Sequence, residues 1–307
     1  MSAVVFAAPV VRTPPPVKTR WRGLSLEWTG PDGVSWDLTD WQSGIVAVTE
    51  GIRGFHLPSV QVQATQYAGQ DGQRRKGATV DPREIELPLL VYGDSSDEWL
   101  GRDQAFWGSF SFLNAGTLKA TTPAGSSRTL KCFLSADGGQ SFDSDPIRGG
   151  WSLYTLTLLA DDPYWVSELP AKSWGTEDPL PFFPATGWPP LQINSASSLS
   201  GATLNNPGDV DAWPIWTITA GSAPVTATIT VDGGVLVTPA IAAGRTLTIN
   251  TDPWVQTATL STGADVYAQM KWDPRPIPAG NSVPVSLVLD QTGTVTCQIF
   301  PKHFRAW

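Results

Sequence analysis

The sequence is poor in the side chains that most often carry catalysis. Its 307 residues include only two histidines, His56 and His303, and two cysteines, Cys132 and Cys297. Neither histidine lies in a nucleophile elbow or at a His-x-x-x-His spacing, so a Ser-His-Asp triad or a histidine metal centre has little support. Two cysteines are too few for a disulfide scaffold, and Cys132 lies in the strand-like "KCFL". We expect structural or surface histidines, unpaired cysteines and no enzymatic activity.

Long basic runs and long apolar runs are also absent. The net charge is −8, and no Lys/Arg cluster exceeds the one in "GQRRKG" at 72–77, which disfavours nucleic acid as a partner. No segment approaches the roughly 20 apolar residues of a membrane span, and the short apolar run at the start is interrupted by Pro9 and lacks a basic flank. No Walker loop or G-x-G-x-x-G opens a helix. We therefore expect no sequence-specific nucleic acid binding, no membrane insertion, no signal peptide, no cofactor and no bound metal.

Tryptophan, glycine and proline are plentiful. The chain has 15 Trp, 29 Gly and 27 Pro, together with many Thr and Val. Aromatic and β-branched residues favour strands, whereas Gly and Pro mark turns. Hydrophobic residues (41%) outnumber charged ones (16%), so the chain has enough apolar surface to form packed cores, and its length favours two domains. The composition predicts a mainly β protein.

The first half is dominated by short strand patterns. "PSVQVQATQ" places Val60, Val62 and Ala64 on one face, which is typical of a half-buried strand, and "REIELPLLV" repeats the alternation. Between them, the polar "YAGQDGQRRKGATVDP" at 67–82 predicts a protruding hairpin arm, with a plain solvated loop as the alternative. The arm residues that we select as candidate inter-subunit contacts are Gln70, Asp71, Arg74, Arg75 and Lys76.

One helix is predicted. "SSDEWLGRDQAFWGSFSFLNAG" begins with Ser95 and Glu98 at capping-box spacing and is expected to end at Asn114. Its aromatic side chains, which we expect to pack on a small barrel or sheet, are Trp99, Phe106, Trp107 and Phe110. Further strands follow, and "DDPYW" at 161–165 is expected to close the domain.

Proline-rich segments suggest the domain boundaries. "TPPP" at 13–16 indicates an extended arm, and six prolines interleaved with aromatic residues indicate a packed connector after 165. The predicted divisions are an extended N-terminal arm at 1–33, an N-terminal domain at 34–165, a connector at 166–190 and a C-terminal β-sandwich at 191–307.

The second half is expected to contain strands throughout. "VTATITVDGGV" alternates Val225, Ala227, Ile229 and Val231 against threonines and turns at Asp232. "RTLTIN", "NSVPVSLVLD" and "TVTCQIF" continue the alternation. Strands at this spacing predict a sandwich of jelly-roll type.

The stretch "NNPGDVDAWPIW" at 205–216 allows two interpretations. Asn206, Asp209 and Asp211 crowd three oxygen ligands together, but a calcium loop needs further oxygens downstream, where this chain has Ala-Trp-Pro-Ile-Trp. The structural interpretation is a turn at Asn206 whose amides the two aspartates cap, with Pro214 starting an edge strand.

Acidic pairs and one turn motif leave a weaker case for sugar chemistry. "SADGGQSF" at 135–142 fits the Asp-box of sialidase propellers, but it occurs once, whereas a propeller repeats it. Two aspartate pairs lie in turns beside proline, where Asp bonds its own backbone: Asp143/Asp145 and Asp161/Asp162. Some tryptophans suit sugar stacking, although core or interface packing explains most of them.

Several motifs, in this order, resemble the distal tail proteins of siphophages, particularly minor tail proteins of phages of actinobacteria. "DPREIELPLLVYGDSSDEWLGRDQAFWGSF" and "DDPYW" look like the strand, helix and closing segment of that family's N-terminal domain. "NNPGDVDAWPIWTITAG", "IPAGNSVPVSL" and "QIFPKHFRAW" look like parts of its C-terminal sandwich. The resemblance spans about residues 34–307. The residues that carry it are Asp162, Pro163, Tyr164, Trp165, Asn206, Gly208, Asp209, Pro214, Gly280, Asn281, Pro301 and Arg305.

The resemblance implies an N-terminal split-barrel-like domain with one helix and a C-terminal galectin-like or jelly-roll β-sandwich. It implies a structural role, as a hexameric ring that connects the tail tube to the tip or baseplate proteins around the DNA channel. The implied partners are other copies of the chain, the tail tube protein, the tail-tip hub protein, the tape measure protein and other minor tail proteins. The implied location is the virion tail tip, after synthesis in the host bacterial cytoplasm. The alternative is a carbohydrate-binding adhesin or module that contacts a host cell-wall glycan.

Overall fold

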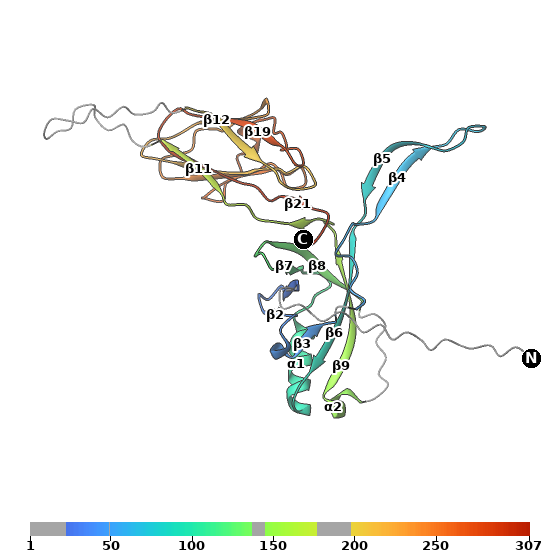
Figure 1. Ribbon diagram of the computed structural model, residues 1–307. Coiled ribbons are helices and arrows are strands. Elements are labelled where there is room, and N and C mark those ends of the chain that lie inside the picture. The colour runs from blue at the N-terminus through green and yellow to red at the C-terminus, as the bar shows by residue number, and fades with distance from the viewer. Residues whose placement is uncertain (1–22, 49, 137–144, 177–197) are drawn as a thin grey trace, which may run out of the picture.

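Two bodies of β-structure lie end to end along the molecule (Figure 1). The computed structural model describes residues 23–48, 50–136, 145–176 and 198–307. Strands make up most of the ordered structure, with one long helix, so the predicted mainly β fold is confirmed. Each body has its own hydrophobic core, one built from residues between Leu26 and Trp165 with Ala306, and the other from residues between Leu204 and Ile299. Among the described residues, no helix has the length and hydropathy needed to cross a membrane.

The N-terminal body is a barrel-like sheet. Its strands run in the order β2 (Ser35–Asp37), β1 (Ser25–Thr29), β7 (Gly116–Thr121), β8 (Ser127–Ala136), β9 (Trp151–Ala160), β6 (Arg83–Tyr92) and β3 (Ile45–Ala47). The two ends of this sheet meet, because the Ala47 N–H donates to the carbonyl of Leu38, just after β2, at 2.7 Å. The barrel is therefore nearly closed. A 3-10 turn, η1 (Trp41–Ser43), connects β2 to β3.

Strand β6 shows how the sequence builds this barrel. Its apolar residues alternate as predicted, and Ile85, Leu87, Leu89 and Val91 are all buried. Strand β6 pairs with β9 along its whole length. The expected extended arm at 1–33 is wrong at its C-terminal end, since residues 25–29 form β1 between β2 and β7. The "TPPP" segment lies outside the described residues.

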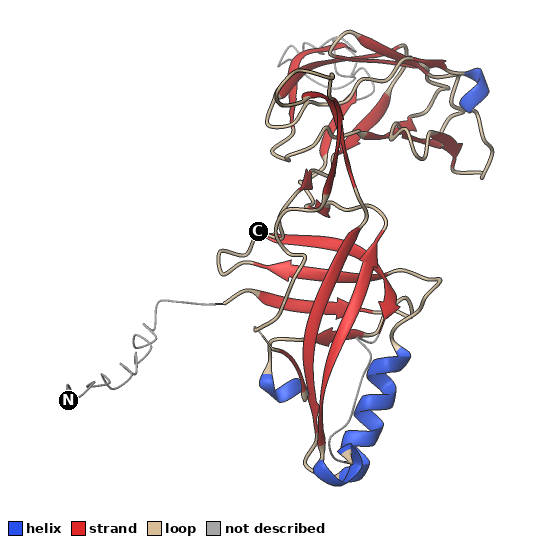
Figure 2. Cartoon of the chain, turned by 90° about the vertical axis from the view of Figure 1, so that its right-hand side faces the viewer, coloured by secondary structure: helices blue, strands red, loops and turns tan. Residues whose placement is uncertain are grey.

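Helix α1 (Ser96–Gly108) covers the lower end of the barrel (Figure 2). The Ser95 hydroxyl accepts the Glu98 N–H at 3.2 Å, as the capping-box spacing predicts. Trp99 and Phe106 are buried in the core. The helix ends at Gly108, not at Asn114, because Ser109 leaves helical geometry and its hydroxyl donates to the Phe106 carbonyl at 2.6 Å. A second, four-residue helix, α2 (Pro146–Gly149), begins after Asp145.

Strands β4 (Val60–Thr65) and β5 (Arg74–Val80) form the protruding arm, which projects away from both bodies (Figure 1). The sequence predicts "PSVQVQATQ" to be half-buried, but nearly every residue of β4 is exposed. Strand β4 pairs only with β5, in a two-stranded sheet of its own. The alternation is real, because the arm has an apolar face and a polar face, yet no part of the described chain covers the apolar face.

The C-terminal body is a sandwich of two five-stranded antiparallel sheets. One contains β11 (Lys172–Thr176), β20 (Gly293–Gln298), β13 (Ile215–Ala220), β16 (Thr246–Asn250) and β17 (Thr257–Leu260). The other contains β12 (Ser198–Asn205), β19 (Ser282–Leu289), β14 (Ala227–Val231), β15 (Gly234–Val237) and β18 (Lys271–Trp272). A short 3-10 turn, η2 (Tyr267–Gln269), precedes β18.

The predicted inward residues of the sandwich are buried. They include Val225, Ala227, Ile229, Val231, Val295, Cys297 and Ile299. The turn between β14 and β15 has positive φ at both Asp232 and Gly233, as a two-residue hairpin requires. Both cysteines are buried and unpaired, and burial raises the pKa of each thiol to about 12.

Two details of the sandwich differ from expectation. Pro214 does not start an edge strand, because β13 lies in the middle of its sheet. Proline is tolerated there because it precedes the first paired residue, Ile215, and no ladder hydrogen bond needs its missing N–H. Strand β11 falls in the range assigned to the connector, yet it pairs with β20 and belongs to the sandwich. Residues 177–190 of that connector lie outside the described residues.

Candidate functional site at the junction of the two bodies

The two bodies meet through two short strands. Strand β10 (Trp165–Val166) leaves the barrel and pairs with β21 (Lys302–His303), through which the chain returns from the sandwich. Strand β10 also pairs with β8 of the barrel. The prediction that residues 191–307 form one sandwich is wrong at its end. Ala306 is buried in the barrel core, and its N–H donates to the Phe55 carbonyl at 3.0 Å.

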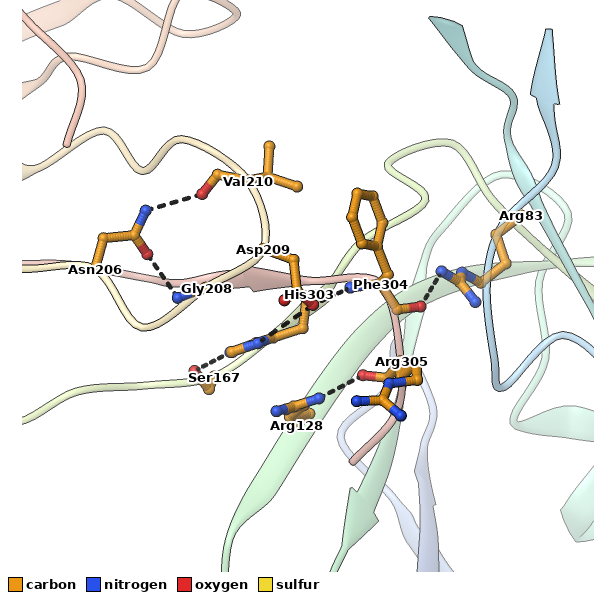
Figure 3. Close-up of polar contacts among 10 residues, drawn as sticks. All are labelled: Arg83, Arg128, Ser167, Asn206, Gly208, Asp209, Val210, His303, Phe304 and Arg305. Carbon is orange, nitrogen blue, oxygen red and sulfur yellow. Dashed lines mark hydrogen bonds and ion pairs between the residues drawn. The ribbon is translucent and has the colours of Figure 1, made fainter. Parts of the chain in front are cut away.

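A buried arginine ties this junction together. Arg83 is 2% exposed and donates to four backbone carbonyls from three separate segments (Figure 3 shows the bond to Phe304). The acceptors are Pro163 at 2.6 Å, Gly54 at 2.5 Å, His56 at 2.8 Å and Phe304 at 2.7 Å. Burial lowers the pKa of Arg83 from its ordinary value, but a guanidinium stays charged in proteins. The base of the arm, the closing segment and the C-terminal tail are thus held by one side chain.

Arg83 could have been found from the sequence. It has the same parity in β6 as Ile85 and Leu87, so the alternation places it on the buried face. An arginine in phase with a core stripe predicts a buried, fully hydrogen-bonded guanidinium. Its partners could not have been found, because they lie between 27 and 221 positions away in the sequence.

Ser167, His303 and Asp209 are the residue types of a hydrolytic triad, and Figure 3 shows them close together. Ser167 Oγ lies 2.8 Å from His303 Nε2, but His303 Nδ1 lies 4.0 Å from Asp209 Oδ2, which is too far for a hydrogen bond. Asp209 Oδ2 instead accepts the Phe304 N–H at 3.0 Å. Asp209 therefore does not orient the imidazole as a catalytic carboxylate would, and the three residues hold β21 in place.

The charge state of His303 is also set by the junction. His303 is buried within β21, so burial lowers its pKa below the ordinary value of 6.5. The positive charge of Arg128 lowers the pKa further, while Asp209 raises it. Arg128 in turn donates to the carbonyl of Arg305 at 2.7 Å. The folded junction thus favours a neutral imidazole. Nothing in the sequence around Ser167 or Arg128 indicates a role at this junction, because their partners His303 and Arg305 lie far away in the sequence.

The "NNPGDVD" segment is part of the same junction. The Asn206 side chain accepts the Gly208 N–H and donates to the carbonyls of Val210 and Ile277, each at 2.9 Å. The two aspartates do not cap their own turn as predicted. Asp209 accepts from Phe304, and Asp211 accepts the Ala279 N–H at 3.1 Å. These carboxylate oxygens accept hydrogen bonds from backbone amides. No group of three metal-ligating side chains is found in the described part of the chain.

Most residues that carry the family resemblance are brought together here. Lys302 joins Asp162 at 2.9 Å, and the Phe304 ring contacts Tyr164. Trp165 is buried in the barrel core. Backbone bonds link Gly280 to Gly208, Asn281 to Asn206, and Pro301 to Ser167. Pro214 is placed differently, with its carbonyl accepting from Thr251 inside the sandwich.

The candidate arm residues do not belong to this cluster. Gln70 and Asp71 lie in the exposed turn of the arm, and Arg74, Arg75 and Lys76 are exposed on β5. Of the candidate acids, Asp145 caps α2, Asp161 is exposed, and Asp143 lies outside the described residues, as does most of the Asp-box segment.

The architecture matches that of known phage tail proteins. The structure of SPP1 Dit superposes with a TM-score of 0.59 and 16% identity, covering 90% of this chain and 98% of that one. A chain of the activated phage P2 baseplate superposes with a TM-score of 0.58 and 13% identity, covering 92% of this chain and 100% of that one. The chain has the fold of a siphophage distal tail protein.

Sequence comparison points the same way. The chain is 24% identical over 213 residues to minor tail protein Gp27 of Mycobacterium phage L5. That match covers 65% of this chain and 62% of the relative, so it spans less than two thirds of the relative's length. No family model matches the sequence. The resemblance to siphophage tail-tip proteins drawn from the motifs is confirmed.

Proposed function

We propose that this protein is a non-enzymatic, ring-forming adaptor of a phage tail tip. The observation that carries the proposal is the likeness to tail-tip and baseplate chains over at least 90% of this chain, together with an arm whose apolar face is uncovered. In this proposal six copies close a ring around the DNA channel. The ring joins the tail tube protein to the tail-tip hub, with the tape measure protein and other minor tail proteins as further neighbours.

The ring-forming part is proposed to be the barrel with its returning tail, and the sandwich is proposed to lie outside the ring. The separate cores of the two bodies support this division. The double crossing through β10 and β21 supports it further, because two paired strands restrict rotation of the sandwich more than one linker would. The protein would be made in the host cytoplasm and then built into the virion.

The arm is proposed to bind the neighbouring copy. Paired residues point to the same side of the ribbon, so Val60 with Val80 and Val62 with Ala78 form an apolar face. Val60 is 50% exposed and Val62 is 40% exposed. A two-stranded sheet that packs on nothing is marginally stable in water, which favours a partner surface. Closed rings need such a heterologous contact.

Charge favours a second copy as that partner. Residues 60–80 contain Arg74, Arg75, Lys76 and Asp71, for a net charge of 3 − 1 = +2. The whole chain carries −8, so the remainder carries −8 − 2 = −10. A basic arm on an acidic protein is attracted to another copy of that protein, and the acidic remainder suits a channel that must not retain DNA.

A face-specific charge substitution tests this. Val60→Glu/Val62→Glu places two charges on the apolar face, and Gln61→Glu/Gln63→Glu places the same charges on the polar face of the same strand. We expect wild type and the polar-face variant to form six-membered rings in electron micrographs and by light scattering. The apolar-face variant should remain a folded monomer with an unchanged circular dichroism spectrum. If the apolar-face variant forms rings, the proposed contact of the arm with a neighbouring copy is refuted. If the wild type is monomeric at every concentration and isolated tails show no ring, the proposed ring is refuted.

A further inference from the structure

Exposed aromatic side chains gather on the outer face of the barrel, at the lower end of β6 and β9. Trp151 is 55% exposed and lies opposite Tyr92 in the β6–β9 ladder. Trp41, at the start of η1, is 65% exposed, and its ring centroid lies 6.2 Å from that of Tyr92. The next pair on the same face is Leu90 with Leu153, and Leu153 is 50% exposed. We call this surface, formed by Trp41, Leu90, Tyr92, Trp151 and Leu153, the barrel patch.

The barrel patch has the composition of a protein-binding surface. Its β6 residues alternate with Leu89 and Val91, which are buried, so the patch points away from the barrel core. Single exposed apolar side chains are ordinary, but a contiguous apolar patch with a polar rim marks an interaction site. Tryptophan and tyrosine are the side chains that most often anchor protein interfaces. The patch therefore requires an apolar partner surface.

The arm of the same chain cannot reach the barrel patch. The arm leaves the barrel at the start of β6, and the patch lies at the other end of this strand (Figure 1). From Arg83 to Tyr92 the strand spans about 30 Å at roughly 3.3 Å per residue. The arm also projects from the barrel in the direction opposite to this span. An arm that covers the patch must therefore come from another copy of the chain.

We propose that the barrel patch binds the apolar face of the arm of a neighbouring copy. This inference rests on the proposed ring and names the surface that receives the arm. Each of the two faces consists of two successive cross-strand pairs of an antiparallel ribbon, so the pairs are about 7 Å apart on both and the ribbons can pack face to face. The pairs are Val60/Val80 and Val62/Ala78 on the arm, and Leu90/Leu153 and Tyr92/Trp151 on the barrel. An arm on one copy and a patch on the next form a heterologous contact, from which closed rings are built.

Charge complements the apolar fit. The arm has three basic residues and one acidic residue, for a net charge of 3 − 1 = +2. The rim of the barrel patch carries the exposed acids Asp40, Asp94 and Asp97. Two further charged residues beside the patch, Asp145 and Arg148, offset each other. A basic arm is therefore attracted to the acidic rim, which orients the apolar faces toward each other.

Substitutions in the patch test the proposal on the full chain. Trp151→Glu places a charge in the patch, and because Trp151 is half exposed, the variant should keep the wild-type circular dichroism spectrum. We expect the protein concentration at which rings form to rise by about tenfold or more, as removal of an anchoring tryptophan does. Trp41→Glu, which changes the other side of the patch, should act in the same direction. Trp254→Glu is the matched control, since Trp254 is 93% exposed on the sandwich, and it should form rings as wild type does.

Mixing two defective variants tests the pairing of arm with patch. Trp151→Glu keeps an intact arm, and Val60→Glu/Val62→Glu keeps an intact patch. Each variant should be monomeric alone in sedimentation velocity. An equimolar mixture should form a head-to-tail dimer, because the one intact contact joins two copies and cannot extend into a ring.

The outcomes separate this inference from the ring itself. If Trp151→Glu and Trp41→Glu form rings at the same concentration as wild type, the arm docks elsewhere, and the inference is overturned while the ring stands. A mixture that stays monomeric, although the wild type forms rings, would overturn it as well. If the wild type forms no ring, the proposed function on which the inference rests is refuted.

Discussion

Replacing Arg83 by methionine removes four charge-assisted hydrogen bonds from the junction while keeping a long, unbranched side chain. Each bond of this type contributes about 1.5–3 kcal/mol, but the four share one guanidinium and do not add. Arg83→Met leaves the four carbonyls without their donor, and a buried polar group left unpaired costs about 1–3 kcal/mol. We therefore expect the free energy of unfolding of the barrel to fall by about 3–5 kcal/mol in Arg83→Met, which is less than the sum of four independent losses.

Urea unfolding followed by tryptophan fluorescence and circular dichroism measures this change. The sandwich has its own core and should keep its transition, so the loss should appear only in the barrel transition. The matched control is Arg53→Met, which removes an arginine with a 75% exposed side chain and a single ion pair to Glu86. Exposed ion pairs contribute about 0–1 kcal/mol, so this control should change little. If Arg83→Met lowers the free energy of unfolding as little as Arg53→Met does, the conclusion that Arg83 holds the junction together is refuted.

Two further substitutions, at His303 and at Asn206, test other contacts of the junction. The pKa of His303 in the folded protein lies below 6.5, so as the pH falls His303 is protonated in the unfolded chain before it is protonated in the folded one. Protonation therefore favours unfolding. The stability of the junction should be full above pH 6.5 and should decline as the pH falls below that value. His303→Gln should flatten that decline in melting curves between pH 8 and pH 5, and identical pH slopes would contradict the idea. Asn206→Ala leaves the Gly208 N–H and the carbonyls of Val210 and Ile277 without a buried partner, and it should cost the sandwich about 2–3 kcal/mol in urea unfolding while sparing the barrel. Equal loss in both transitions would instead show that the two bodies unfold as one.

Much of the local structure could be predicted because it depends on neighbours in sequence. Ser95 and Glu98 form their cap within four residues, and the turn at Asp232 needs only the φ values of two residues. The alternation in β6 and β14 places the core residues correctly, since side chains on a strand alternate between faces. The end of the helix was missed, because Ser109 is held by the distant Trp28, whose indole N–H donates to its hydroxyl at 3.1 Å.

The junction could be predicted only in part. The sequence motifs around Asp162, Asn206 and Pro301 carry the family resemblance, but nothing in the sequence shows that these segments are in contact. Asp209 contacts Phe304, 95 positions away, and Asp162 contacts Lys302, 140 positions away. Arg83 was readable as a buried residue from its parity, yet its four acceptors are backbone groups, which have no sequence signature at all.

By itself, the sequence determined the class of this protein: strands from alternation, one helix from its cap, and a phage tail resemblance from ordered motifs. The tertiary structure alone decided that the last residues return to the barrel, that one arginine holds arm, closing segment and tail together, and that the apolar face of the arm is left open. The physical reason is the same in each case. Alternation shows that a strand has an apolar face, whereas what covers that face depends on chain segments brought close only by folding or by assembly.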